Sequence, residues 1–345
     1  LKINWFKKGF SFLMAKFTGK KYEKSFLNLF VSMSFFPQMV QGPIAHYPKL
    51  IEQVKNLKGF EYQRFCMALQ LMLWGYFKKL VIADRIAVFV NQVFDHIGYY
   101  RGLVFVLALM ASAVQLYADF SGCMDIVEGV AELFGITLDK NFDVPFSSKS
   151  TAEFWRRWHI TLGNWFKDYL LYPVSMSGLC KSINRFTRKK WGNQASRAFS
   201  TVIPAACVWV VTGVWHGAAM CYVLWGVYHG ILIILGAVFE MPIQKLCKAL
   251  HMNTECFSFD LFRMIRTFFL SAIGRIFFVS TAGFSHAILI MKRTFDFRHF
   301  GLHTLWDESL YTFGLDRHGF TLAMLLVVLV WCVSMLQEKF DKDNK

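Results

Sequence analysis

The sequence contains little charge for its length. Only 18% of its 345 residues are charged, whereas 55% are hydrophobic and 17% are aromatic. An ordinary soluble domain has about 25% charged residues. So few charges argue against a soluble globule, whose surface must face water, and a disordered chain would be polar and poor in aromatic residues. The composition therefore excludes disorder and favours a bundle of membrane helices.

The sequence also lacks the motifs of several common enzyme classes. It has no Gly-x-x-x-x-Gly-Lys phosphate loop, no dinucleotide fingerprint and no Gly-x-Ser-x-Gly elbow, which excludes the usual ATPases, nicotinamide enzymes and serine hydrolases. Its eight cysteines form no Cys-x-x-Cys pair, and we expect unpaired thiols. Asp296, His299 and His303 are spaced like metal ligands, but this pattern is a weak signal, so no metal ion is expected.

Acidic residues are scarce relative to basic ones, 23 against 38, and the formal charge is +15. In a soluble protein this excess would point to nucleic acid. Here the basic residues lie in short loops between apolar runs, a distribution that the positive-inside rule and anionic lipid headgroups explain. The sequence therefore predicts a lipid bilayer as a partner and no nucleic acid.

Runs without Asp, Glu, Lys or Arg mark the segments that could cross a membrane, since a spanning helix needs about 20 mostly apolar residues. The uncharged runs are Ser25–Pro48, Gly102–Ala118, Ala198–Phe239, which is long enough for two helices, and His318–Gln337. Two further segments are interrupted by charges: Phe65–Phe94 and Thr267–Met291. Each could be a broken span, or a span joined to an interfacial helix. The sequence predicts an all-α polytopic membrane protein with roughly six to eight membrane helices.

The segment Asp139–Arg197 is too polar for a simple spanning helix and too aromatic for an ordinary linker. Ser150-Thr151-Ala152-Glu153 matches a capping box, which starts a helix. An aromatic stripe and a polar stripe follow at helical spacing, which predicts one amphipathic helix in the membrane interface, continuing as far as Tyr169. The basic run Lys181–Arg197 is predicted to be a cytoplasmic loop.

Two histidines lie in the uncharged run Ala198–Phe239, each between glycines: Gly213-Val214-Trp215-His216-Gly217 and Gly226-Val227-Tyr228-His229-Gly230. An ionisable group at membrane depth is costly and usually faces a polar cavity. On one continuous helix their 13-residue separation would place them about 220° apart, so we expect only one to serve a given site. His216 could have a functional role or could simply donate a hydrogen bond to a backbone carbonyl between helices. For His229 we favour the second, structural role.

A third histidine, His159, lies on the predicted amphipathic helix. An interfacial histidine more often makes a packing or headgroup contact. Its aromatic and cationic neighbours nevertheless suit a phosphate-bearing partner, such as a phosphopantetheine thioester or a lipid headgroup. These neighbours are Trp155, Arg156, Arg157 and Trp158.

Two carboxylates, Asp119 and Asp125, flank Ser121-Gly122 where an uncharged run ends. We expect a turn at the membrane boundary there. Both residues could be interfacial caps, or they could orient a histidine or bind a polar acceptor.

Several short motifs spread over most of the chain form a recognisable set. They are Phe35-Phe36-Pro37-Gln38 with Gly42-Pro43, Gly75 with Lys78-Lys79 and Ile82-Ala83-Asp84-Arg85, Tyr117–Gly122, Asn141-Phe142 with Pro145, Glu153–Tyr172, Trp215-His216-Gly217 and Ile276-Phe277-Phe278. The set resembles the membrane-bound O-acyltransferase (MBOAT) family, in its bacterial, alginate O-acetyltransferase-like branch. Cys123 and Arg275 depart from the pattern, which would have aromatic residues at both positions.

The resemblance implies an MBOAT-like helical bundle with interfacial or re-entrant helices and a central tunnel. Residues 1–345 would form a single membrane domain that lacks N-terminal helices, with residues 139–197 as an interfacial segment. His216 would be the catalytic general base, and His159 a second catalytic residue lining the same tunnel. We expect the remaining substrate-binding residues to be Trp155, Arg156, Arg157, Trp158, Asp119, Asp125 and Trp215.

The resemblance also implies a function. A multi-pass protein of the bacterial cytoplasmic membrane would move an acyl group, expected to be acetyl, from a cytoplasmic thioester toward hydroxyls of an extracellular polysaccharide. The donor would be acetyl-CoA or an acyl carrier protein, no cofactor would be bound, and an extracytoplasmic SGNH-hydrolase-like transferase would be a partner. The alternatives are D-alanyl transfer to teichoic acid, a transporter, and a membrane anchor without enzymatic activity.

Overall fold

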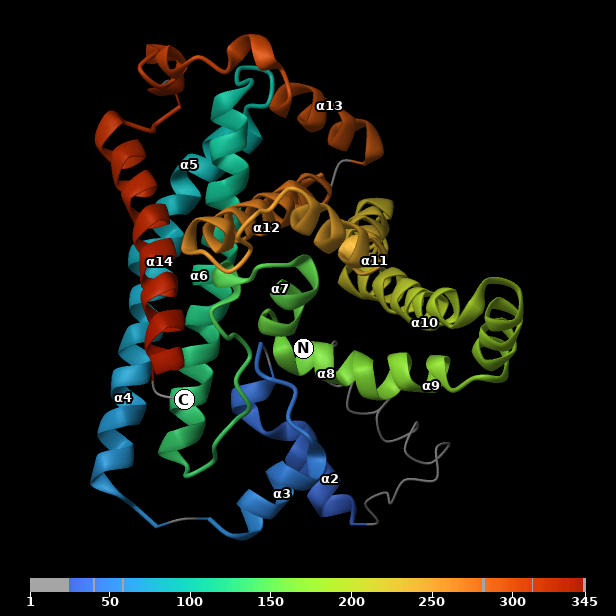
Figure 1. The fold of residues 1–345 in the computed structure, drawn as a ribbon. Coiled ribbons are helices and arrows are strands. Elements are labelled where there is room, and N and C mark those ends of the chain that lie inside the picture. Colours follow the sequence, from blue (N-terminus) through green and yellow to red (C-terminus); the bar gives the residue numbers. More distant parts are fainter. Residues whose placement is uncertain (1–24, 40, 58, 281–282, 312, 344–345) are drawn as a thin grey trace. The chain divides into compact units, whose positions relative to one another are not determined.

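The computed structural model describes residues 25–343, apart from residues 40, 58, 281–282 and 312. Within this part of the chain all regular elements are helical, and one isolated β-bridge joins Phe142 to Trp158 (Figure 1). Among the described residues, five helices are long and apolar enough to cross a membrane: Tyr62–Asp95, Leu103–Leu133, Phe199–His216, Met220–Ala249 and Arg317–Lys339. The predicted all-α, polytopic architecture is confirmed.

One uncharged run, Ser25–Pro48, is not a single spanning helix, and this part of the prediction is wrong. The run contains only the short α2 (Phe26–Ser34), a 3-10 turn at Phe36–Gln38 and the start of α3 (Tyr47–Lys55). Its prolines cannot continue a helix, since they lack the backbone donor and clash with the preceding turn. An uncharged run therefore shows that a segment is apolar but not that it is one helix.

The two charge-interrupted segments have different structures. Phe65–Phe94 lies within one continuous helical stretch, whereas Thr267–Met291 is divided between two helices. The stretch consists of α4 (Tyr62–Tyr76), the π-helical turn η2 (Phe77–Ala83) and α5 (Asp84–Asp95). The divided segment contributes to α12 (Phe257–Val279) and α13 (Phe284–Thr294). Charges inside a segment thus do not reveal whether its helix continues.

The chain divides into two compact units. Unit 1 comprises residues 25–84, Tyr117–Asp143 and Trp158–Tyr169, and unit 2 comprises Arg85–Leu116, Val144–Arg157 and residues 170–343. Three of their boundaries, after residues 84, 116 and 169, fall inside helical elements, so neither unit coincides with a stretch that the sequence marks off. The expected single membrane domain stays a prediction.

Unit 1 contains an apolar cluster and one close helix crossing. The cluster comprises Leu50, Ala131, Ile136 and Leu138. The crossing joins α4 to α6 (Leu103–Leu133) at two glycines, where a Cβ on Gly75 would lie 2.6 Å from the carbonyl oxygen of Gly122. Because any larger residue would push the two backbones apart, this crossing fixes the spacing of the polar residues beside it.

Unit 2 is built around α10 (Gly178–His216) and α11 (Met220–Ala249), which lie side by side (Figure 1). They too meet at glycines, since a Cβ on Gly226 would lie 3.2 Å from the Cα of Gly213 and would overlap the carbonyl oxygen of Trp209. Helix α12 packs against α11, and Gly274 of α12 makes room there for the ring of His229. Small residues at both contacts let helices approach without a driving force from water.

The basic run Lys181–Arg197 consists of two helical segments of α10 that meet at a kink, so the prediction of a loop is wrong. Its backbone leaves helical geometry only at Gly192, whose φ is 84°. Lys and Arg are good helix formers, and an excess of positive charge indicates the side of a membrane but not the backbone conformation. The cytoplasmic placement of this run stays a prediction.

Replacing Gly226 with alanine tests the α10–α11 crossing. The new methyl group would meet backbone atoms that cannot rotate away, so we expect a loss of about 1–3 kcal/mol in the free energy of unfolding. Gly236 of the same helix has open space around it, and Gly236→Ala should leave stability unchanged or slightly higher. Thermal unfolding of both variants in detergent checks this, and equal midpoints would contradict the crossing.

Candidate active site

His216 is the last residue of α10, and it lies among aromatic side chains of unit 2. The centroid of its ring is 4.6 Å from that of Trp215, 4.7 Å from Trp225 and 5.3 Å from Phe278. The next residue must be small, because a Cβ on Gly217 would lie 2.5 Å from the ring of Tyr222. The end of one helix thus presents a half-buried imidazole within a largely apolar, aromatic surround.

His229 also contacts Trp225, and it is buried. Its ring centroid is 5.0 Å from that of Trp225, and its Nδ1 makes no hydrogen bond to any residue of the described chain. The expected backbone-carbonyl partner is therefore missing at this nitrogen, and the Nε2 atom faces Gly274 of α12. Since α10 ends before α11 begins, the angle derived for one continuous helix does not apply.

Helix α7 (Thr151–Arg157) starts at the predicted capping box. The backbone N–H of Glu153 donates to Ser150 Oγ at 3.2 Å, and Glu153 accepts from the N–H of Lys149 at 2.9 Å. The ring of Trp155 packs on that of His229 with centroids 4.8 Å apart. Arg156 is exposed. The helix therefore directs its aromatic side chain into unit 2 and one cation outward.

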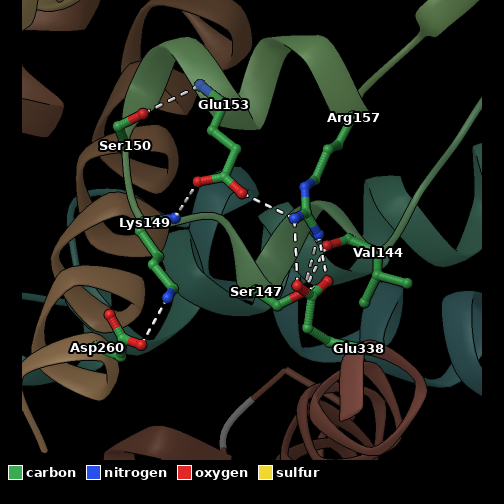
Figure 2. A network of polar contacts seen from close by, with 8 residues as sticks. All are labelled: Val144, Ser147, Lys149, Ser150, Glu153, Arg157, Asp260 and Glu338. Atoms are coloured by element: carbon green, nitrogen blue, oxygen red, sulfur yellow. Dashed lines mark hydrogen bonds and ion pairs between the residues drawn. The ribbon is translucent and has the colours of Figure 1, made fainter. Parts of the chain in front are cut away.

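Arg157 is held by two carboxylates, as Figure 2 shows. Its guanidinium donates to Glu153 at 2.7 Å and forms an ion pair with Glu338 of α14 (Arg317–Asp343). The hydroxyl of Ser147 donates to Glu338 at 3.3 Å. Beside this network, Lys149 pairs with Asp260 of α12 at 2.5 Å. Arg157 was predicted to bind substrate; in the structure it joins α7 to α14.

The helix is interrupted at His159, and this break contradicts the single helix predicted for residues 150–169. The φ of His159, 49°, is left-handed, and α8 (Ile160–Phe166) begins only after it. The break is stabilised from outside the segment, because the N–H of Ile160 donates to the carbonyl oxygen of Asn141 at 2.9 Å. Trp158 packs on Phe142 with ring centroids 5.1 Å apart.

The Asn141 side chain orients the His159 ring within unit 1. Its Oδ1 accepts from the backbone N–H of Thr161 at 3.2 Å and from the Thr161 hydroxyl at 2.9 Å. A backbone N–H can only donate, so the atom facing it is the amide oxygen. That oxygen lies 3.1 Å from His159 Nδ1, which must therefore carry a proton. In the neutral ring the basic nitrogen is then Nε2.

Asp119 and Asp125 lie inside α6 and not in a turn, so that expectation is wrong. Asp119 pairs with Lys79 at 2.8 Å, and Asp125 pairs with Lys78 at 2.6 Å. Lys78 also donates to the hydroxyl of Ser121 at 3.1 Å. The lysines of η2 compensate the carboxylates, which allows α6 to continue through both charges.

Sequence reasoning gave no individual role to three residues that shape these clusters. Asn141 belongs to a short motif, but only its hydrogen bonds show that it sets a tautomer. Trp225 contacts both His216 and His229, and nothing in its spacing predicted that. Glu338 lies in α14, directly after the uncharged run His318–Gln337. An acidic residue at that position was the available sign of a polar contact.

Comparison with known proteins gives one family and several relatives. Residues 10–188 match the family model described as MBOAT, membrane-bound O-acyltransferase family. The chain is 34% identical over 227 residues to a peptidoglycan O-acetyltransferase of Helicobacter pylori, covering 64% of this chain and 39% of that protein. It is 30% identical over 248 residues to a probable alginate O-acetylase of Pseudomonas syringae pv. tomato, covering 72% and 42%.

A teichoic acid D-alanyltransferase of Bacillus subtilis is 29% identical over 213 residues, covering 61% of this chain and 51% of that protein. The matches to these three relatives thus cover about four- to five-tenths of their lengths. The names of these three relatives refer to three different acceptors: peptidoglycan, alginate and teichoic acid.

Replacing Glu338 with alanine tests the contact between α7 and α14. Removal leaves the mostly buried Arg157 with one carboxylate instead of two, so we expect a loss of about 3 kcal/mol in the free energy of unfolding. The matched control is Lys339→Ala, which removes an exposed charge beside it and should change stability by less than about 0.5 kcal/mol. Equal unfolding midpoints in detergent would contradict the role of the pair.

Proposed function

Because the chain belongs to the membrane-bound O-acyltransferase family, we propose that it transfers an acyl group from a thioester to a hydroxyl, with His216 as the general base. The observation that carries the proposal is the aromatic surround of His216 at the end of α10. Such a surround excludes water, which would otherwise compete with the acceptor for the thioester. An imidazole titrates near neutral pH, as a general base must.

The reaction is a proton transfer coupled to acyl transfer. The acceptor hydroxyl gives its proton to His216 while its oxygen attacks the thioester carbonyl. The carbon–sulfur bond then breaks, and the thiolate that leaves takes the proton back from the imidazolium. Atoms and charges balance without a metal ion or a redox cofactor.

His159 is proposed to position the donor or the acceptor through Nε2, the basic nitrogen left by its bond to Asn141. Among the other proposed substrate-binding residues, Arg156 is exposed and can meet an anionic group directly. Asp119, Asp125 and Arg157 are engaged in ion pairs and would act mainly by shaping the protein. The aromatic residues Trp155, Trp158 and Trp215 would line the path of the acyl group.

The acyl group is proposed to be acetyl and the acceptor an extracellular polysaccharide, which agrees with relatives named for peptidoglycan and alginate O-acetylation. The donor would be acetyl-CoA or an acyl carrier protein on the cytoplasmic side of a bacterial membrane. Transfer would continue through an SGNH-hydrolase-like partner outside. D-alanyl transfer is the second candidate, favoured by the teichoic acid relative. Thioester consumption by purified protein separates both from a transporter or an anchor.

His216→Ala should lower the rate of acyl transfer by about 10²- to 10⁴-fold, because the acceptor hydroxyl loses its base. The measurement is the O-acetyl content of the polysaccharide and the rate of thioester consumption, at equal abundance of the protein in the membrane. His318→Ala is the control, since His318 is exposed on α14 and should transfer at the normal rate. Normal transfer by His216→Ala would overturn the assignment.

A double-mutant cycle tests whether Asn141 acts through His159. Asn141→Ala, His159→Ala and the double variant should lower the rate to a similar extent, with a coupling of about 1–2 kcal/mol. Asn164→Ala removes an exposed asparagine from α8 and should leave the rate unchanged. Additive losses would show that Asn141 affects the protein by another route.

A further inference from the structure

Arg275 of α12 is a partly buried cation that makes no hydrogen bond and no ion pair within the described chain. Its Nε and Nη1 atoms are inaccessible to solvent and make no hydrogen bond within the described chain, and Arg275 takes part in no ion pair there. Its guanidinium lies over the ring of Phe278, 5.0 Å from the centroid. A guanidinium carries five donors, and leaving buried donors unpaired costs more than the ring contact returns.

Packing against α11 fixes the position of Arg275. Gly274 admits the ring of His229, and the hydroxyl of Tyr228 donates to the carbonyl oxygen of Leu270 at 2.8 Å. These contacts turn one side of α12 toward α11. Arg275 and Phe278 are three residues apart and therefore lie about 60° from each other on the helix, which places both on or next to that side.

Phe278 connects Arg275 to the site of the proposed base. Its ring is 5.3 Å from that of His216, 5.7 Å from Trp225 and 5.2 Å from Tyr222. The unpaired guanidinium is therefore one aromatic ring away from His216, within unit 2. An oxyanion that reached it would be bound in weakly polar surroundings, where a charge-assisted hydrogen bond is strong.

We propose that Arg275 binds an oxyanion, either phosphate or carboxylate, of a substrate that is processed at His216. This inference rests on the proposed function and names the chemical class of one substrate. A planar guanidinium presents paired N–H groups that match both kinds of oxyanion. Two sources supply this chemistry: the phosphates of a coenzyme A or phosphopantetheine donor, and a carboxylate of an acidic acceptor glycan.

The experiment compares charged and uncharged substrates in reconstituted protein. Donors are acetyl-CoA and S-acetyl-N-acetylcysteamine, a thioester without phosphate; acceptors are a uronate oligosaccharide and a neutral oligosaccharide. For Arg275→Met we expect the KM of one charged substrate to rise about 10- to 100-fold, with kcat and the KM of its uncharged counterpart nearly unchanged. A higher KM for acetyl-CoA would show that Arg275 binds the phosphates of the donor. A higher KM for the uronate would show that it binds the carboxylate of the acceptor.

Two further variants separate binding from folding. Arg275→Lys keeps the charge and should restore part of the affinity. Arg263→Met removes an arginine of the same helix that already pairs with Asp260 at 3.7 Å, and it should change no KM. Unchanged KM values in Arg275→Met, or equal changes for charged and uncharged substrates, would overturn the proposal. If Arg275→Met does not fold, the same comparison is made with Arg275→Lys, whose KM for the charged substrate alone should then rise.

Equilibrium binding of coenzyme A and of the uronate oligosaccharide needs no turnover and separates this proposal from the proposed function. If the wild-type protein consumes no thioester, acyl transfer fails. Tighter binding of either probe to the wild type than to Arg275→Met would still support the oxyanion site. Equal binding of both probes to the two proteins would overturn it.

Discussion

Close contact between helix backbones is the constraint on which both units depend. Gly226 meets Gly213 between α10 and α11, Gly274 receives His229 between α12 and α11, and Gly75 meets Gly122 between α4 and α6. In lipid, water does not drive helices together, so dispersion between closely packed surfaces must do so. The first two contacts bring aromatic rings from three helices around His216, and the third brings two lysines next to two carboxylates. The polar groups are positioned because the backbones are close.

Many polar side chains in unit 1 form ion pairs or hydrogen bonds with one another. These interactions explain where the helices there continue and where they break. Lys78 and Lys79 meet the carboxylates of α6, so each of the two helical stretches carries two of these four charges through an apolar region without ending. Asn141 offers one oxygen to three donors, which holds the left-handed backbone at His159 and fixes the proton on Nδ1. Each pair joins residues far apart in the chain, and each replaces water that a membrane cannot supply.

The sequence was sufficient for features that depend on local composition and insufficient for those that depend on a distant partner. Hydropathy placed α11, α14 and the end of α10, and the motif with His216 stood out because glycines and a histidine are rare together in an apolar run. The break at His159 could not be predicted, since aromatic spacing favours a continuous helix and the competing hydrogen bonds come from Asn141. The continuity of Tyr62–Asp95 was missed for the same reason, because the partners of its lysines lie in α6.

Two arginines of unit 2 show how burial and pairing divide structural from ligand-binding roles. Arg157 has two carboxylates and a hydroxyl within reach, so the folded chain itself offsets the cost of removing its charge from water. Arg275 lies over an aromatic ring and has no hydrogen bond or ion pair within the described chain. A ring offers a cation about 0.5–2 kcal/mol, less than the several kcal/mol that desolvation of an ion costs. Within the described chain, the arrangement around Arg275 is therefore electrostatically unfavourable. An oxyanion bound at the proposed site would relieve it, which would contribute to selectivity for a charged substrate.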